Sequence, residues 1–420
     1  MTATRRTSTA LVPADVDPQR WPDIAAVPHN PARAAIARRV FRHAVRRLPL
    51  RVVEAGNWSG GGTGSDPVMR LERPDEFYAR LGAGGTIGFG EAYMARDWVT
   101  DDLTGVLSAF AAHMRDLIPP ALQTLRHAVL SRQPGHHDNT IAGARENIHQ
   151  HYDLSNDLFS LFLDETMTYS SAIFAGDPSR STESLADAQR RKIDRLLDSA
   201  GVTDGTSVLE IGTGWGELAM RAAARGAVVT TLTISTEQAA LAEQRIRAAG
   251  LDDRVTVMLQ DYREVRGRYD AVVSVEMIEA VGANHWDEYF HTIDRVLAPG
   301  GRVGLQAILQ DDRTVHATKD TFTWIRKYIF PGGQCASLEA IERTLAAHTS
   351  LTVSDRYSFN RHYAETLHRW RMRFEEHAAE VGALGFDDTF RRMWSMYFAY
   401  SEAGFRTGYL DVQQMTLTKV

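Results

Sequence analysis

Residues 208–216 read VLEIGTGWG, a short apolar run followed by three glycines at alternate positions. Glycines placed in this way after a strand let the backbone approach a ligand closely and turn tightly into a helix. The spacing G-x-G-x-G differs from the G-x-G-x-x-G of dinucleotide-binding loops, which seat a pyrophosphate at a helix N-terminus. The carboxylates of Glu210 and Glu217 flank the loop, and they disfavour a pyrophosphate and favour a cationic ligand.

The chain around this loop alternates between apolar runs typical of strands and amphipathic runs typical of helices. Strands are expected at 208–211, 228–233, 255–259, 271–275 and 301–309, with helices at 216–225 and 237–249. This alternation predicts an α/β fold with a doubly wound, mostly parallel sheet, whose ligand lies at the carboxyl ends of the strands. S-adenosylmethionine carries a sulfonium and an ammonium group. A class I methyltransferase domain therefore fits both the order of the elements and the charge of the loop.

Composition narrows the class of protein. The 420 residues suffice for two or three domains, and the single cysteine, Cys335, excludes an internal disulfide framework and a cysteine-based zinc site. His149 and His151 lack carboxylates at metal-binding spacing, so no metal is expected. The net charge of −6 argues against nucleic-acid binding. Because the sequence shows neither an apolar signal core nor a membrane-spanning run, a cytoplasmic location is expected.

The N-terminal region is basic although the whole chain is acidic. From Pro31 an amphipathic helix is expected, with Asn30 as its N-cap. Arginines lie on its flanks, and its apolar positions recur every four residues, at Ile36, Val40, Ala44 and Leu48, with Phe41 and Val45 beside them. Such a helix either rests on anionic lipid headgroups or docks on its own domain, and the periodicity leaves both interpretations open.

Three parts are expected along the chain. Residues 1–130 are expected to form a smaller, mixed α+β domain that contacts lipid, and the polar run SRQPGHHDNT at 131–140 is the candidate linker. Residues 141–420 then form the methyltransferase domain, with helices from Asp320 onward laid over the sheet to cover the acyl-binding side. Within the first part, the glycine-dense stretch 81–98 predicts tight turns and short strands rather than a helix.

Several motifs occur in one order along the chain. They are HYDLSNDLFSLFLDETMTYSSAIF (151–174), LEIGTGWGELA (209–219), LTISTEQ (232–238), QDYR (260–263), EMIEAVG (276–282) and RKYIFPGG (326–333). Together with IGFGEAYM (87–94), they resemble cyclopropane-fatty-acyl-phospholipid synthases over most of the chain. The resemblance implies an enzyme, peripheral to the membrane, that moves a methyl group from S-adenosylmethionine onto the cis double bond of a phospholipid acyl chain.

Carried over position by position, the resemblance implies a set of residues that contact S-adenosylmethionine. They are Tyr169, Ser170, Gly212, Gly214, Thr233, Gln238, Asp261 and Tyr262. The two glycines let the methionine portion approach closely, and Gln238 can bond the ribose. Asp261 is expected to accept a hydrogen bond from the adenine amino group, and Tyr262 to pack beside the adenine ring.

The resemblance also implies how the carbocation left on the acyl chain is resolved. In cyclopropane-forming members a bound bicarbonate takes the proton, held by a glutamate, a histidine, a tyrosine and the backbone beside a cysteine. Glu279 and Tyr363 match the glutamate and the tyrosine. Ser171, however, stands in place of the cysteine, and Gln306 stands in place of the histidine. Whether bicarbonate binds therefore stays open. Tyr328 is expected to present its ring to the carbocation.

These replacements bear on the product. Without the imidazole, a hydride shift followed by loss of a neighbouring proton gives a methylene branch of the 10-methylene stearoyl type, and the sequence favours this outcome. A cyclopropane synthase is the first alternative, and a non-catalytic lipid-binding member of the family is the second. The expected partners are an anionic phospholipid surface and a separate reductase that converts the methylene to a methyl branch. Formation of a homodimer stays open.

Two more residues carry expectations. Glu276 is expected to share a helix face with Glu279, three residues later, and is as readily structural as catalytic. Cys335 has no evident histidine partner and is expected to be a partly buried, unreactive thiol.

Overall fold

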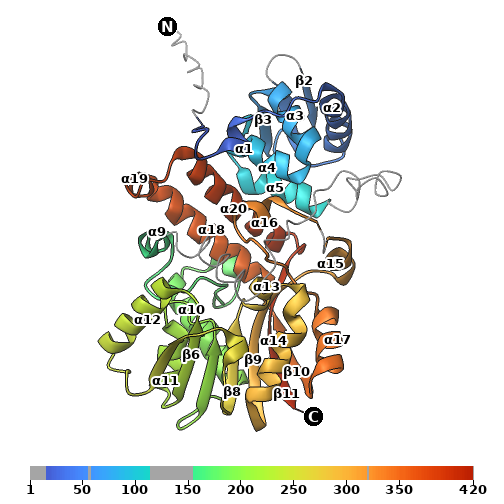
Figure 1. Ribbon diagram of the computed structural model, residues 1–420. Coiled ribbons are helices and arrows are strands. Elements are labelled where there is room, and N and C mark those ends of the chain that lie inside the picture. The colour runs from blue at the N-terminus through green and yellow to red at the C-terminus, as the bar shows by residue number, and fades with distance from the viewer. Residues whose placement is uncertain (1–15, 55–57, 114–154, 319–320, 420) are drawn as a thin grey trace. The chain divides into compact units, whose positions relative to one another are not determined.

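Figure 1 shows the computed structural model, which describes residues 16–54, 58–113, 155–318 and 321–419. Its internal contacts divide the chain into two compact units, Met1–Asp102 with Phe386–Met396, and Leu103–Gly385 with Tyr397–Val420. The candidate linker at 131–140 and the boundary expected at residue 130 lie outside the described residues. The return of residues 386–396 to the first unit has no signal in the sequence.

The larger unit is built on a seven-stranded sheet, in the order β10-β11-β9-β8-β5-β6-β7. Its strands are β5 (Ser207–Ile211), β6 (Val228–Thr233), β7 (Val255–Leu259), β8 (Tyr269–Val275), β9 (Leu297–Leu309), β10 (Leu351–Ser358) and β11 (Asp411–Lys419). Pairing is parallel from β7 through β6, β5 and β8 to β9, whereas β11 runs antiparallel to both β9 and β10. The predicted doubly wound, mostly parallel sheet is therefore confirmed.

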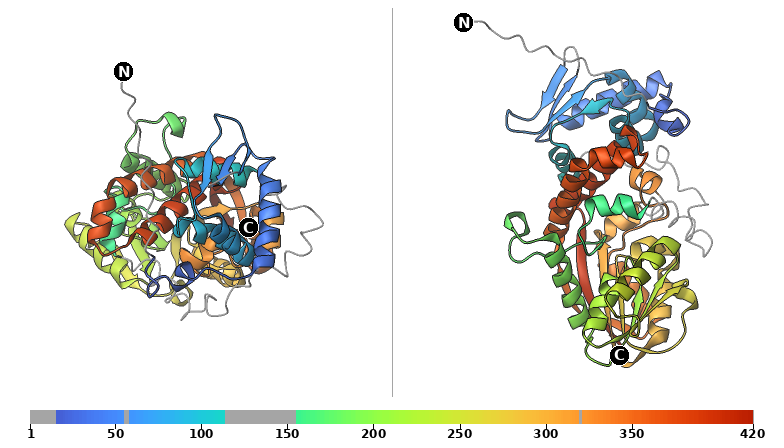
Figure 2. Two further views of the ribbon diagram at one scale, coloured as in Figure 1. Left: turned by 90° about the horizontal axis from the view of Figure 1, so that it is seen from above. Right: turned by 90° about the vertical axis from the view of Figure 1, so that its left-hand side faces the viewer.

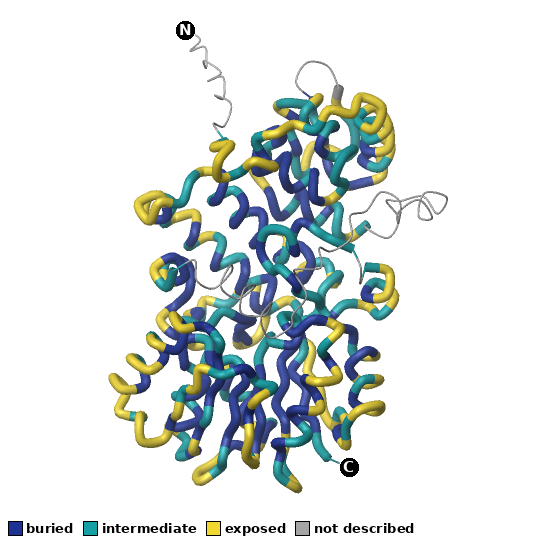
Figure 3. Tube along the Cα trace, in the orientation of Figure 1, coloured by how far each residue is buried: buried dark blue, intermediate teal, exposed yellow. Residues whose placement is uncertain are grey.

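Alternate residues of the strands enter two separate cores. Val272 packs in one cluster with the apolar faces of α14 (Trp286–Val296) and α17 (Leu338–His348). Its neighbour Val273 packs in the other cluster with α10 (Leu185–Ser199), α11 (Glu217–Ala224) and α12 (Thr236–Ala248). Successive side chains of a strand point to opposite faces, so continuously apolar strands require helices on both sides. Figure 3 shows the sheet as mostly buried and the outer turns of these helices as exposed.

The helices of the larger unit supply these layers and the segments around the site. They are α5 (Leu103–Ala112), α9 (Asn156–Phe162), α10 (Leu185–Ser199), α11 (Glu217–Ala224), α12 (Thr236–Ala248), α13 (Ile278–Val281), α14 (Trp286–Val296), α15 (Asp312–Thr318), α16 (Trp324–Tyr328), α17 (Leu338–His348), α18 (Asn360–Glu376) and α19 (Ala378–Ala383). Short 3₁₀ turns lie at Pro178–Arg180, Tyr262–Glu264 and Ala283–His285. Helix α20 (Asp388–Arg406) contributes residues up to Met396 to the smaller unit.

The smaller unit carries a four-stranded sheet in the order β2-β1-β3-β4, beside its helices (Figure 2, right). Its elements are α1 (Pro22–Ala25), α2 (Pro31–Val45), β1 (Arg51–Glu54), β2 (Trp58–Gly61), β3 (Val68–Leu71), α3 (Pro74–Gly84), α4 (Thr86–Met94) and β4 (Trp98–Val99). Strand β1 pairs antiparallel with β2 and parallel with β3. The expected mixed α+β character of this part is what the structure shows.

The prediction of turns and short strands over residues 81–98 is wrong, because α3 and α4 are helical there. Two of the glycines allow close packing of helices rather than breaking them. A Cβ at Gly82 would lie 2.7 Å from the carbonyl oxygen of Arg33 in α2, and one at Gly88 would lie 1.9 Å from that of Arg80 in α3. Only Gly85, at φ +55°, interrupts the helical path. Tertiary packing outweighs the low helix propensity of glycine at these positions.

Helix α2 begins as predicted, since the Asn30 side chain accepts a hydrogen bond from the backbone N–H of Arg33 and proline occupies the first turn. Its buried face consists of Phe41 and Val45, and Leu48 is buried just beyond the helix. The apolar positions predicted at Ile36 and Val40 instead face solvent, with exposed fractions of 65% and 38%. Of the predicted apolar positions, Phe41, Val45 and Leu48 are therefore buried, whereas Ile36 and Val40 lie outside.

Candidate active site

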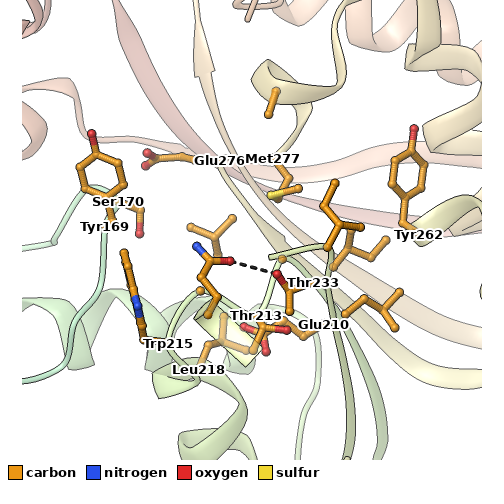
Figure 4. Close-up of a pocket in the computed structure, with 18 of the residues that line it drawn as sticks. Tyr169, Ser170, Glu210, Thr213, Trp215, Leu218, Thr233, Tyr262, Glu276 and Met277 are labelled. Atoms are coloured by element: carbon orange, nitrogen blue, oxygen red, sulfur yellow. Dashed lines mark hydrogen bonds between the residues drawn. The ribbon is translucent and has the colours of Figure 1, made fainter. Parts of the chain in front are cut away.

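A pocket lies at the carboxyl ends of β5, β6 and β8, where the strand order reverses. Strands β6 and β7 lie on one side of β5, and β8 and β9 lie on the other, so the loops after these strands diverge and leave a crevice. The eight residues expected to contact S-adenosylmethionine all line this pocket. Figure 4 labels four of them, Tyr169, Ser170, Thr233 and Tyr262. The structure thus brings together residues spread over more than ninety positions of the chain, although their role in binding stays a prediction.

The glycine loop supplies the floor of the pocket in left-handed backbone conformations. Gly212 has φ +99° and Gly214 has φ +52°. A Cβ at Gly212 would lie 2.7 Å from the side chain of Met277, so the position has no room for one. At Gly214 a Cβ would meet no atom within 4 Å, so the backbone there lies against open space. An approaching ligand can therefore reach the backbone of the loop itself.

Residues after β6 and β7 form one wall. The hydroxyl of Thr233 donates to the Gln238 side-chain oxygen at 3.0 Å, the contact drawn as a dashed line in Figure 4. This bond fixes the Gln238 amide and leaves its NH₂ group as the donor for a ligand. Asp261 is 2% exposed, and its carboxylate is held by Arg263 at 2.8 Å from each oxygen. The ring of Tyr262 meets that of Tyr289 edge to face, at 5.4 Å between centroids.

The opposite wall comes from the segment before α10. The hydroxyl of Tyr169 donates to that of Tyr397 at 2.8 Å, and the ammonium group of Lys192 donates to the Ser170 hydroxyl at 2.6 Å. Lys192 is 1% exposed. Burial lowers the pKa of Lys192 to about 8, although the nearby Glu276, Asp164 and Glu210 oppose the shift. No pattern in the sequence marks Lys192 as a pocket residue, because a lone lysine in an amphipathic helix is normally on the surface.

The two carboxylates that flank the glycine loop have different surroundings. Glu217 is paired with Arg245 at 3.0 Å and with Arg190 at 3.8 Å, so its charge is already compensated. Glu210 is 3% exposed and accepts a hydrogen bond of 2.6 Å from Thr231. Burial raises the pKa of Glu210 to about 8, with Thr231 and then Lys192 opposing the shift. A buried carboxylate at the pocket wall without a guanidinium partner suits a cationic ligand, as the sulfonium and ammonium groups require.

Glu276, directly after β8, is the centre of the polar cluster beside this pocket. Its carboxylate accepts hydrogen bonds from the Ser171 backbone N–H at 3.0 Å, the Gln306 amide at 2.7 Å and the Tyr363 hydroxyl at 2.6 Å. Three of the predicted catalytic residues therefore converge on Glu276, whose side chain points toward the side where Tyr169 and Ser170 lie (Figure 4). Burial raises its pKa, and Lys192 is the main opposing influence.

The prediction that Glu276 and Glu279 share a helix face is wrong. Glu276 precedes α13 and has φ +52°, a left-handed conformation rare for a residue with a side chain. Glu279 lies on α13, where one carboxylate oxygen accepts from the Ile308 backbone N–H. Its second oxygen is buried and has no hydrogen-bond partner among the described residues. Burial, reinforced by Glu276, raises the pKa of Glu279 to about 8.

Two other predicted features lie away from the pocket. Tyr328, on α16, packs its ring on Trp324 with centroids 5.8 Å apart and is not among the residues that line the pocket. Cys335 is partly buried, as expected, and burial raises the pKa of its thiol to about 12, so it is not a ready nucleophile. His149 and His151 lie outside the described residues.

The described part of the chain holds no cluster of three or more histidine, cysteine, aspartate and glutamate side chains arranged for a metal ion. Among the helices that the structure describes, none is both long and apolar enough to cross a membrane.

The sequence is similar to known lipid-modifying enzymes over nearly its whole length. Residues 140–415 match the family described as mycolic acid cyclopropane synthetase. The chain is 51% identical over 413 residues to a tuberculostearic acid methyltransferase of Mycobacterium tuberculosis, with 97% of each chain covered. It is 33% identical over 371 residues to the cyclopropane-fatty-acyl-phospholipid synthase of Escherichia coli K12, covering 85% of this chain and 89% of that one.

Solved structures agree with the observed fold. A mycolic acid cyclopropane synthase complexed with SAH and CTAB matches with a TM-score of 0.60 and 31% identity, over 68% of this chain and 99% of that one. Coclaurine N-methyltransferase matches with a TM-score of 0.57 at 17% identity, covering 76% of this chain and 95% of that one, and this shows a common fold only.

Proposed function

This chain belongs to the mycolic acid cyclopropane synthetase family, and from that premise we propose that it methylates the double bond of an unsaturated phospholipid acyl chain and yields a methylene-branched chain. It is an S-adenosylmethionine-dependent methyltransferase, as the sequence predicted. The observation that carries the choice of product is the 51% identity with the tuberculostearic acid methyltransferase, against 33% with the cyclopropane synthase of Escherichia coli. Tuberculostearate-type lipids are methyl-branched, so a methylene chain is their natural precursor.

The pocket residues suit the ligand that supplies the methyl group. S-adenosylmethionine supplies an electrophilic methyl group on a positively charged sulfur. The open backbone at Gly214 would accept its amino-acid portion, the Gln238 amide would donate to its ribose, and the Tyr262 ring would lie beside its adenine. The buried carboxylate of Glu210 would face the positive charge of the ligand. Among the described residues of the protein, Lys192 is the one cation that acts on this carboxylate. The Asp261 carboxylate, which Arg263 already holds in place, would accept a hydrogen bond from the adenine amino group.

An alkene is a weak nucleophile, so the protein must align it and exclude water. The wall of the pocket formed by Met277, Ala280 and Val281 is apolar and follows directly on Glu276. An acyl chain that entered along this wall would bring its double bond close to both the donor site and the carboxylate. The arrangement favours reaction at carbon over reaction at oxygen or nitrogen, because it offers an apolar surface beside a buried acid.

Contact with the lipid surface is proposed for α2. Ile36 and Val40 are exposed on this helix, and Arg39 and Arg46 are exposed beside them. Apolar side chains with flanking arginines are typical of helices that rest on anionic headgroups.

A methylene product needs two electrons and two protons to become a methyl branch, so a separate reductase is the proposed consumer of the product.

The test is to incubate the protein with S-adenosylmethionine and oleoyl phospholipid vesicles and to identify the modified chain. A methylene-branched chain and a cyclopropane chain are isomers, so mass alone does not separate them. Proton NMR of the released methyl esters does, because alkene CH₂ protons and ring CH₂ protons resonate far apart. Alkene protons support the proposal. Ring protons favour the cyclopropane synthase alternative, which the identity with the Escherichia coli enzyme supports. Ligand binding with no modified lipid favours the non-catalytic alternative.

A further inference from the structure

The acidic side chains at the pocket wall are not equivalent. Asp261 and Glu217 are each paired with an arginine, Arg263 and Arg245, so a cation of the protein already occupies each of these carboxylates. Glu210 lies on β5, beneath the glycine loop, where the cationic ligand is proposed to bind. Glu276 alone among these four is fixed by three donors that carry no formal charge.

The backbone at Glu276 is in a conformation that glycine adopts freely and that other residues adopt at a cost in free energy. At φ +52° the chain turns so that the carboxylate reaches the donors of Ser171, Gln306 and Tyr363. Strained positions of this kind persist where the surroundings hold them, and they concentrate at functional sites. If packing alone mattered at this position, glycine would adopt the same backbone conformation with less strain than glutamate.

The donors around Glu276 are themselves held in orientation. The Gln306 side-chain oxygen accepts from Gln414 at 3.1 Å, so its NH₂ group must face the carboxylate. The Tyr363 ring stacks on Phe405 with centroids 4.3 Å apart. These contacts leave the carboxylate little freedom, and burial gives it a higher proton affinity than a solvated glutamate has.

Deepening the proposed function, on which this inference rests, we propose that Glu276 is the general base of the reaction and that its carboxylate takes the place of a free anion. The positions that the family resemblance associates with a bicarbonate site, Gln306, Tyr363 and the backbone of Ser171, here donate to a carboxylate of the chain itself. The Glu276 side chain therefore fills the site that an external base would need.

With Glu276 as the base, every proton and electron pair in the reaction is accounted for. Methyl transfer forms a carbon–carbon bond with the two electrons of the double bond and leaves a carbocation on the adjacent carbon. A hydride then moves from the methyl-bearing carbon to that carbon, and the positive charge moves to the methyl-bearing carbon. Glu276 takes a proton from the new methyl group, the C–H electron pair becomes the C=CH₂ bond, and the carboxyl returns the proton to solvent.

Two variants separate this role from packing. Glu276→Gln keeps the shape of the side chain but cannot accept the proton, and we expect turnover to fall at least about 100-fold, with the dissociation constant for S-adenosylmethionine changing less than about threefold. Glu276→Gly relieves the backbone strain and frees the three donors, so we expect it to be inactive in bicarbonate-free buffer and to regain turnover with added bicarbonate or formate. The exposed Glu339→Gln is the matched control, with wild-type turnover expected.

Binding of ¹³C-bicarbonate, followed by NMR line broadening, gives a readout that does not depend on turnover. We expect binding to Glu276→Gly and none to the wild-type protein, whose turnover is also unchanged when bicarbonate is removed. Loss of wild-type turnover without bicarbonate, full turnover by Glu276→Gln, or no bicarbonate binding by Glu276→Gly would each overturn the proposal. A ring product from the wild-type protein would refute the methylene assignment alone, because the dependence on Glu276 and on bicarbonate is measured separately.

Discussion

The Tyr363 hydroxyl donates a 2.6 Å hydrogen bond to the Glu276 carboxylate, although the two residues are 87 positions apart in the sequence. One follows the strand β8 at the centre of the parallel sheet, and the other lies on α18. Their contact joins the pocket at the carboxyl edge of the sheet to the helical segment that follows β10. The contact matters to the proposed mechanism because it helps to fix a pocket carboxylate that no arginine among the described residues neutralises.

Removal of the Tyr363 hydroxyl tests that contact directly. Tyr363→Phe deletes one of three donors to a buried carboxylate, and a hydrogen bond to a charged group contributes about 1.5–3 kcal/mol. We expect kcat to fall by about ten- to a hundredfold while the affinity for S-adenosylmethionine stays the same. Tyr357→Phe, with an exposed ring, is the control. Equal activity of the two variants in steady-state assays would show that the contact is dispensable.

The replacement of a histidine by Gln306 is expected to affect anion binding only when Glu276 no longer fills the anion site. In the double variant Glu276→Gly, Gln306→His we expect bicarbonate to bind more tightly than in Glu276→Gly, because a protonated imidazole adds a charged donor. We also expect a larger share of cyclopropane in the product, measured by proton NMR of the methyl esters. A double variant that forms only the methylene product would disprove a link between the donor at position 306 and ring closure.

Binding of S-adenosylmethionine is expected to strengthen as pH rises. Without ligand the pKa of Glu210 is raised to about 8, so below this pH its carboxyl is mostly protonated and must release the proton to receive a cation. Lys192, whose pKa is lowered to about 8, loses its competing charge over the same range. The dissociation constant, measured by calorimetry, should therefore fall by up to about tenfold per pH unit between about pH 6 and about pH 8.

The matched control for this pH dependence is Glu210→Gln, which removes the titrating carboxyl but keeps its approximate shape. We expect weaker binding and a shallower pH dependence, with only the contribution of Lys192 left. An unchanged slope in this variant would show that Glu210 does not face the cationic ligand.

Membrane contact through α2 can be tested without disturbing the fold. Arg38 and Arg42 pair with Asp75 and with the buried Glu54, so they should be left intact. Reversal of the exposed Arg39 and Arg46 to glutamate should weaken binding to anionic vesicles about tenfold or more at low salt, since each basic residue near such a surface contributes about 1 kcal/mol.

Co-sedimentation with vesicles of anionic and of neutral phospholipid measures this effect. Arg247→Glu, on the exposed face of α12, is the control and should bind as the wild-type protein does. Unchanged sedimentation of the Arg39→Glu, Arg46→Glu variant would exclude α2 as the lipid-contacting helix.

The glycines of the smaller unit give a test of packing. A Cβ at Gly88 would lie 1.9 Å from the Arg80 carbonyl oxygen, so Gly88→Ala should destabilise the unit by about 2 kcal/mol or more. Gly84→Ala, where the nearest atom lies 3.7 Å away, should be neutral or stabilising because alanine favours the helix. Urea unfolding measures both variants. A smaller loss for Gly88→Ala than for Gly84→Ala would show that the close approach of α3 and α4 is not required.

Local patterns were sufficient for much of the larger unit. The glycine loop, the five parallel strands β5 to β9 and helices α11 and α12 follow from apolar runs and turn residues that act within a few positions of each other. The eight residues assigned to the cofactor by resemblance all reached one pocket, because the carboxyl ends of parallel strands meet at one edge of a sheet. Strands β10 and β11 were missed, since residues after Asp320 are rich in aromatic and basic side chains that fit helices and strands alike.

By itself, the sequence determined the class I methyltransferase fold, the place of the pocket and the positive charge of its ligand, because these depend on periodicity and on the residues next to the glycine loop. Only the tertiary structure decided that α3 and α4 are helices and that Ile36 and Val40 face outward, because both depend on which backbone lies opposite. It also decided that Ser171, Gln306 and Tyr363 donate hydrogen bonds to Glu276 rather than to Glu279. The left-handed turn at Glu276 aims its carboxylate at donors from distant segments, and no local pattern encodes that direction.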